Sequence, residues 1–277
     1  MSASATPAIC NRIDDVFARC REQRRAALIL YLTSGFPTED ATRRILPVLA
    51  EAGCDLIELG VPFSDPIADG PVIQKASTIA LNAGITLPTT LKLAKEFRTS
   101  HDTPLILFGA LNPFLHRGLK EAAAMARDAG ADGILAADLP LDEAEEFRAD
   151  LYAEGLHLIT LVAPTTPDSR LEQFAAQCTG FLYCISYKGT TGTKSISSAT
   201  MREYLDRLRR RIDIPLAVGF GIKTPADVQA AVQAGADGVV VGTSLITLIE
   251  EAFAANKDVE NTVREYVKSL AAALKKQ

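Results

Sequence analysis

The chain has 277 residues and a formal net charge of −5, with 48% hydrophobic and 23% charged residues. This length suits one α/β barrel, and the composition is that of a globular protein. The negative charge and the lack of a dense Lys/Arg run argue against nucleic acid or an anionic membrane as the main partner, and the basic cluster 207–211 (RLRRR) is interpreted as a solvated helix face.

The N-terminus and the cysteines favour a cytoplasmic protein. Residues 1–10 (MSASATPAIC) lack the apolar segment of a secretion signal, and the chain has no run of 18 apolar residues. The five Cys are odd in number and form no CxxC motif, which suits a reducing compartment. Cys54, Cys178 and Cys184 stand in apolar surroundings and are expected in the core.

Apolar runs and amphipathic stretches then alternate along the chain. Residues 1–11 are expected to form a loose N-terminal arm, and 13–25 an amphipathic helix across one end of the fold. Strands are predicted at 27–35, 55–60, 103–110, 132–140, 156–164, 180–186, 214–221 and 237–242. Helices are predicted at 39–53, 71–84, 87–98, 119–130, 141–155, 167–178, 198–211, 224–235 and 256–276, with a short extra helix at 244–250.

Eight strands, each followed by a helix, predict an α/β fold of the (β/α)8 TIM barrel type. The strands are continuous apolar runs, as expected when both faces of a parallel sheet are covered. No GxGxxG follows the first strand, which argues against a doubly wound sheet, and no flexible linker divides the chain. We expect residues 1–277 to form a single barrel domain with an extra N-terminal helix and extra helices in the βα loops.

In such a barrel the active site lies where the strands end, so the polar residues there are candidates. Glu58 closes an apolar strand and is either a general acid/base or a structural Glu bonded to the backbone or to a Tyr. Asp69 is a second catalytic carboxyl or the cap of the helix from 71, and Asp138 is a helix cap or a partner of Glu58. The three His are scattered, which predicts no metal site.

Three glycine-containing loops suggest a phosphate site. They are GTTG (189–192), GFG (219–221) and GTS (242–244), where backbone N–H groups can approach an anion. Thr243 and Ser244 add hydroxyl donors at the start of the helix 244–250. The alternative is tight turns and an ordinary N-cap.

The stretch 58–71 (ELGVPFSDPIADGP), followed by IQKAS, closely resembles the signature of the tryptophan synthase alpha subunit family. Further matches keep their order over roughly residues 20–275, among them ADLP (137–140), AVGFGI (217–222) and DGVVVGTS (237–244). The resemblance implies a lyase of tryptophan biosynthesis. It would cleave indole-3-glycerol phosphate by a retro-aldol reaction and pass the indole to a beta subunit.

The resemblance also implies roles for particular residues. Glu58 would carry the proton and Asp69 would bond the indole N–H, with support from Asp138 and from Thr191 in a lid over the substrate. The expected phosphate ligands are Gly192, Gly221, Gly242, Thr243 and Ser244, and the expected indole pocket residues are Tyr31, Phe220 and Leu135. Pro62 and Asp65 would face the beta subunit in an α2β2 complex. No cofactor or metal is expected in this chain, and pyridoxal phosphate is expected only in the beta subunit.

The sequence departs from the family pattern at Phe36, where an acidic residue is usual, at Ala110, where Tyr is common, at Tyr187, where Arg is usual, and at Thr243, where Ser is usual. These changes suggest low intrinsic activity that depends on the beta subunit. The alternatives are a weakly active or inactive homologue that serves to activate the beta subunit, a free-standing lyase that releases indole, and a barrel acting on another sugar phosphate.

Overall fold

Nine parallel strand segments form the barrel in the computed structural model, which describes residues 9–185, 198–219 and 221–276. Their order around the sheet is β5-β4-β3-β2-β1-β9-β8-β7-β6. The segments are β1 (Ala27–Thr33), β2 (Leu56–Gly60), β3 (Leu105–Gly109), β4 (Gly133–Ala136), β5 (His157–Leu158), β6 (Thr160–Val162), β7 (Leu182–Cys184), β8 (Leu216–Val218) and β9 (Gly238–Val241). The predicted barrel class is confirmed.

The fifth predicted strand is divided into β5 and β6, and this division closes the barrel. β5 pairs with β4, whereas β6 pairs with β7. The intervening Ile159 still donates its N–H to the carbonyl of Ile134 at 2.9 Å. The segment 157–162 therefore pairs with β4 along its first part and with β7 along its second part. The two ends of the sheet meet in this segment.

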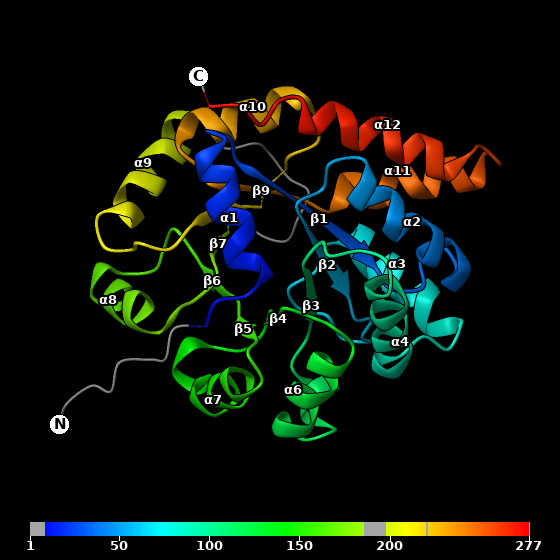
Figure 1. Ribbon diagram of the computed structural model, residues 1–277, viewed down its shortest axis with the longest axis horizontal. Helices are drawn as coiled ribbons and strands as arrows, with labels where there is room; N and C mark the ends of the chain where they lie inside the picture. Colours follow the sequence, from blue (N-terminus) through cyan, green and yellow to red (C-terminus); the bar gives the residue numbers. More distant parts are fainter. Residues whose placement is uncertain (1–8, 186–197, 220, 277) are drawn as a thin grey trace.

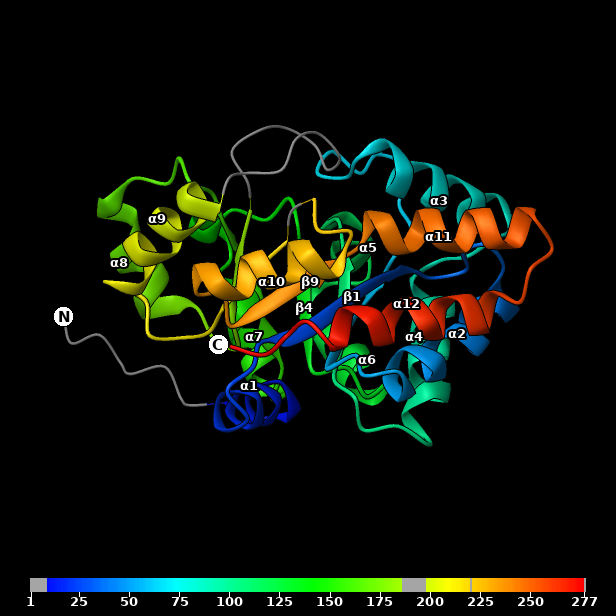
Figure 2. The same ribbon diagram turned by 90° about the horizontal axis from the view of Figure 1, so that it is seen from above.

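The helices surround the barrel, as Figures 1 and 2 show. They are α1 (Arg12–Glu22), α2 (Glu39–Glu51), α3 (Pro71–Asn82), α4 (Leu87–Arg98), α5 (Asn112–Leu115), α6 (Leu119–Asp128), the 3-10 turn η1 (Leu141–Glu143), α7 (Glu145–Ala153), α8 (Asp168–Gln177), α9 (Ser198–Arg209), α10 (Pro225–Ala234), α11 (Thr243–Ala254) and α12 (Val259–Ala271). The sequence did not predict α5, and α11 is longer than the helix expected at 244–250.

Helix α1 covers the end of the barrel where the strands begin (Figure 1). Ile13 and Phe17 are 0% and 4% exposed and belong to the apolar cluster inside the barrel. The Phe17 ring lies 5.4 Å from that of Phe181. Buried His157 joins Asp14 of α1 to Thr179, at 2.8 Å from each. Since this end is covered, the opposite end remains for a ligand.

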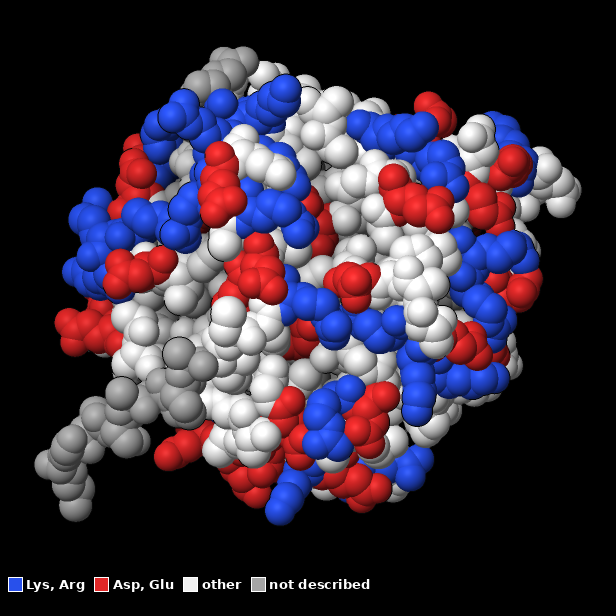
Figure 3. Space-filling model, viewed as in Figure 1, with Lys and Arg blue, Asp and Glu red and all other residues white. Residues whose placement is uncertain are grey.

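The basic cluster at the end of α9 lies on the surface, where three of its four Arg pair with carboxylates. Arg207 and Arg211 pair with Asp168 at 2.7 and 3.0 Å, and Arg209 pairs with Asp237. Figure 3 shows acidic groups interspersed with the basic ones on this face. The five cysteines are all free, and Cys54, Cys178 and Cys184 are buried as expected. Within the described ranges, no helix is long and apolar enough to cross a membrane.

Candidate active site

Glu58 is a buried carboxyl group with no hydrogen bond to any described residue. It lies in β2 between Tyr31 of β1 and Ile106 of β3, and it is 1% exposed. Neither carboxyl oxygen has a partner in the described part of the chain. Burial raises the pKa of Glu58 to about 8, because the charged form loses its hydration. Glu58 is therefore mainly protonated at neutral pH, and the alternative of a Glu bonded to backbone or Tyr finds no support.

Asp69 follows β2 in the loop 61–70 and does not cap α3. The N-cap of α3 is Gly70, which makes no side-chain capping bond, and Pro71 begins the helix. The cap interpretation of Asp69 is therefore wrong. The loop is held by the Asp69 N–H, which donates to Pro66 O at 3.0 Å, and by Gln74 Nε2, which donates to Asp69 O at 2.9 Å.

The two carboxyl groups differ in protonation near neutral pH. Burial raises the pKa of Asp69 to about 6, so this group is mainly ionised where Glu58 is mainly neutral. Burial, reinforced by these two carboxyl groups, raises the pKa of Tyr31 and of Tyr183 in β7. Tyr183, which the sequence did not single out, therefore shares the electrostatic environment of Glu58 and Asp69. Paired groups with separated pKa values are typical of acid–base sites.

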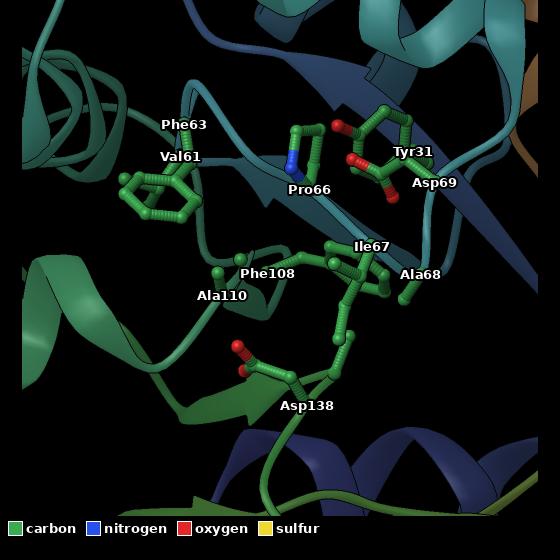
Figure 4. A pocket seen from close by; sticks show the side chains of 12 residues that line it. Tyr31, Val61, Phe63, Pro66, Ile67, Ala68, Asp69, Phe108, Ala110 and Asp138 are labelled. Atoms are coloured by element: carbon green, nitrogen blue, oxygen red, sulfur yellow. The ribbon is translucent and has the colours of Figure 1, made fainter.

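A pocket partly open to solvent lies where β1 to β4 end. Figure 4 shows Asp69 beside Tyr31 at one end of it and Asp138 at the other. The Tyr31 and Phe108 rings meet edge to face at 5.2 Å. The complete lining is Tyr31, Val61, Phe63, Pro66, Ile67, Ala68, Asp69, Phe108, Gly109, Ala110, Ala137 and Asp138. Mostly apolar walls with carboxylates at both ends suit a flat aromatic ligand that carries a polar group.

Leu135 does not line this pocket, which corrects the sequence prediction. It is 0% exposed and belongs to the apolar cluster inside the barrel. Ala137, two residues later, lines the pocket instead. Residues two apart in a strand share one face, so Leu135 lies one layer deeper than Ala137. The same alternation relates Phe108 of β3 to Ala110, the residue just after this strand, and it is the sequence signal that would have identified Phe108 as a pocket residue.

Asp138 supports the loop after β3. Its Oδ1 accepts a hydrogen bond of 2.7 Å from the backbone N–H of Leu111, the N-cap residue of α5. Since neither oxygen of Glu58 has a described partner, Asp138 does not bond Glu58 directly. Asp138 thus holds the start of α5 in place while its side chain lines the pocket.

The start of α11 and the turn after β8 meet at the same end of the barrel. Gly242 is the N-cap of α11, and a Cβ atom there would lie 3.3 Å from the Cβ of Tyr31, a pocket residue. Gly221 is exposed, with a φ of +56° that favours glycine. Ser244 Oγ donates to the carbonyl of Ile222 at 3.2 Å. The single Ser244 hydroxyl proton is therefore engaged, which leaves its backbone N–H as the donor for an anion.

The other residues singled out from the sequence fall partly outside the described ranges. Thr191, Gly192, Phe220 and Tyr187 fall outside the described residues. Pro62 is buried and Asp65 is exposed on the loop before Asp69. Phe36 is 1% exposed and packs in the outer core, whereas Ala110 lines the pocket.

A metal site is not apparent in the described ranges, where no three His, Cys, Asp or Glu side chains are placed to hold an ion. His157 is used at the covered end of the barrel, and His101 stacks on Phe97 with ring centroids 4.7 Å apart.

Comparison with known proteins gives consistent results. The model of the family described as tryptophan synthase alpha chain matches residues 17–275. The tryptophan synthase alpha chain of Geobacter sulfurreducens is 44% identical over 264 residues, covering 95% of this chain and 99% of its own length. That of Caulobacter vibrioides NA1000 is 44% identical over 266 residues, with 96% of each chain covered.

Solved structures agree with these relatives. The tryptophan synthase subunit alpha of Legionella pneumophila strain Paris has a TM-score of 0.89 at 36% identity, covering 95% of this chain and 98% of that one. A chain of Mycobacterium tuberculosis tryptophan synthase has a TM-score of 0.88 at 34% identity, covering 97% and 100%.

Proposed function

The chain belongs to the tryptophan synthase alpha chain family, and we propose that Glu58 and Asp69 are its catalytic pair. It is a lyase of tryptophan biosynthesis that cleaves indole-3-glycerol phosphate to indole and glyceraldehyde 3-phosphate, and its partner is a beta subunit. The observation that carries the assignment of the pair is their placement at one strand end: Glu58 is buried in β2 with neither carboxyl oxygen bonded to a described residue, and Asp69 lines the pocket from the loop that follows.

The reaction needs one proton donor and one anion. Indole cannot leave as a C3 carbanion, so neutral Glu58 first transfers its proton to C3 of the ring. The ring then becomes a cationic indolenine, and ionised Asp69 stabilises it by bonding the ring N–H. Glu58, now a carboxylate, takes the proton of the hydroxyl on the carbon attached to C3. The O–H electrons form the aldehyde C=O, and the C–C electrons return to the ring, which leaves Glu58 protonated again.

Glu58 is buried and is not among the residues that line the pocket, whereas Asp69 is; the other lining residues would bind and orient the substrate. The rings of Phe63 and Phe108 and the side chain of Ile67 supply apolar surface for the indole. The phosphate would lie against backbone N–H groups of Gly192, Gly221, Gly242, Thr243 and Ser244, at the positive end of the α11 dipole. Tyr31, whose Cβ lies close to Gly242, would join the two subsites. Asp138 would position the loop after β3, and Thr191 would act in a lid.

Activity of two isosteric variants tests the pair. Indole release from indole-3-glycerol phosphate is measured with a beta subunit present for Glu58→Gln and Asp69→Asn. We expect each variant to lose at least about 100-fold in kcat, since each removes a proton-transfer or charge-stabilising group. A Glu58→Gln variant with normal kcat would refute the proton transfer.

The partner surface is proposed at the loop 61–70 and at α5. Ile67, which lines the pocket, is 77% exposed and follows exposed Asp65, and Leu115 of α5 is 50% exposed; exposed apolar side chains are typical of a docking surface. Pro62 is buried, and its ring would make the backbone of the loop 61–70 more rigid. An Ile67→Asp variant that still co-purifies with the beta subunit as well as the original chain would contradict this placement.

Several further properties are proposed together. The complex is α2β2, pyridoxal phosphate belongs to the beta subunit, and this chain uses no cofactor. The chain acts in the cytoplasm, which free buried thiols support, and the described residues form one domain. The alternative of an inactive homologue that only activates the beta subunit is not favoured, since both carboxyl groups of the pair are present. Rates with and without the beta subunit measure how far activity depends on it.

A further inference from the structure

A tyrosine of the last helix contacts both backbone segments of the proposed phosphate site. The hydroxyl of Tyr266 in α12 lies 2.7 Å from the carbonyl oxygen of Lys223 and 2.9 Å from Ser244 Oγ. Ser244 Oγ in turn donates to Ile222 O at 3.2 Å. Two hydroxyl groups thus connect α12, the first turn of α11 and the turn between β8 and α10.

The connected segments are those that would hold the anion. Ile222 and Lys223 directly follow Gly221, and Ser244 lies two residues after Gly242, the N-cap of α11. An anion bound by N–H groups from both segments needs them at a fixed separation, because a hydrogen bond weakens steeply outside its narrow range of distance and angle. The hydroxyl groups of Tyr266 and Ser244 keep the two segments at this separation through their hydrogen bonds.

The contact is not needed to attach α12. Val263, Val267 and Leu270 of this helix are each 0% exposed, and α12 packs against α11 and α2 (Figure 2). This apolar face holds the helix whether or not residue 266 carries a hydroxyl. Tyr266 is half-buried, and its hydroxyl lies within hydrogen-bond distance of polar groups of the neighbouring segments, so its effect is local.

We propose that Tyr266 is a positioning residue for the substrate phosphate: its single hydroxyl proton is donated to one acceptor at a time, Ser244 Oγ or the Lys223 carbonyl, and each of these bonds ties α12 to a segment of the phosphate site. Ser244 then contributes its backbone N–H to the phosphate, and its hydroxyl holds the two segments together. This inference rests on the proposed function, because it assigns a support to the same phosphate subsite.

The test compares Tyr266→Phe with Tyr152→Phe in the complex with a beta subunit. Tyr152 is a matched control, because its hydroxyl also lies near one carbonyl and one hydroxyl group, 3.4 Å from Gln177 O and 3.3 Å from Thr179 Oγ1. Thr179 belongs to the covered end of the barrel, away from the pocket. For each variant we measure KM and kcat for indole-3-glycerol phosphate, and inhibition constants for glycerol 3-phosphate and for indole.

Tyr266→Phe is expected to raise KM and the inhibition constant of glycerol 3-phosphate about 3- to 10-fold, the effect of losing one hydrogen bond. It should leave kcat within about twofold and the inhibition constant of indole unchanged, since neither depends on the phosphate subsite. Ser244→Ala should show the same selective loss, and it replaces Tyr266→Phe if the latter is unstable. Tyr152→Phe should change none of these constants.

Failure of the inference is distinguishable from failure of the proposed function. If glycerol 3-phosphate competes equally well against Tyr266→Phe and the original chain, the positioning role is wrong and the phosphate subsite stands. The role is also wrong if the affinity for indole falls as much as that for glycerol 3-phosphate, or if Tyr152→Phe has the same effect. If glycerol 3-phosphate does not compete even in the original chain, the phosphate subsite itself is wrong.

Discussion

Replacing Glu58 by glutamine is expected to change how the folding stability depends on pH. The carboxyl group titrates at about 8 when folded, against an ordinary value of 4.5. Between these two pH values the unfolded chain ionises Glu58 and the folded chain does not, so raising the pH favours the unfolded state. The stabilisation from neutral Glu58 is fully present below about pH 4.5 and is lost as the pH rises to about 8.

The magnitude follows from the width of this window. At about 1.4 kcal/mol for each pH unit between 4.5 and 8, ionisation lowers the free energy of unfolding by up to about 5 kcal/mol. Glutamine remains neutral throughout, so Glu58→Gln avoids this loss. The stability of the variant relative to the original chain should therefore rise across the window and level off above about pH 8.

Urea unfolding of the chain without its partner, followed by circular dichroism from about pH 5 to 9, measures this difference. A constant difference in stability between variant and original chain over the range would refute the reasoning, because it would mean that Glu58 ionises alike in both states. Asp69→Asn serves as the control. The difference in stability between Asp69→Asn and the original chain should level off near pH 6, where the pKa of Asp69 lies.

Three more predictions follow from the same structure. The profile of kcat/KM against pH should be bell-shaped, falling below about pH 6 as Asp69 is protonated and above about pH 8 as Glu58 ionises; a flat profile from pH 5 to 9 would contradict the acid–base assignment. Gly60→Ala should lower the thermal midpoint and the activity, because its Cβ would clash with the Tyr31 hydroxyl, and the costs of such overpacking are about 1–3 kcal/mol. Phe17→Ala should cost about 3–5 kcal/mol in urea unfolding while leaving the KM of the folded enzyme unchanged, since the ring fills the barrel end opposite the pocket.

The sequence was sufficient for features that depend on local chemistry. Apolar runs separated by amphipathic stretches located every strand and the long helices, since each element carries its own periodicity. The same logic placed Glu58 and Asp69 near one end of the barrel, because all parallel strands end on the same side. Free buried cysteines also followed from their apolar neighbours.

Other features depended on contacts between distant residues and required the tertiary structure. The short α5 stands where Asp138 accepts the Leu111 N–H, a contact 27 positions apart that no local pattern encodes. Leu135 lies in the apolar cluster inside the barrel and does not line the pocket, and its depth depends on how neighbouring strands align. The pKa values of Glu58 and Asp69 differ because segments far along the chain bury the two groups to different depths. Tyr266 reaches Ser244 because α12 packs beside α11. Desolvation and hydrogen bonding act through space, so the sequence supplied the groups and the packing of the barrel decided their chemical state.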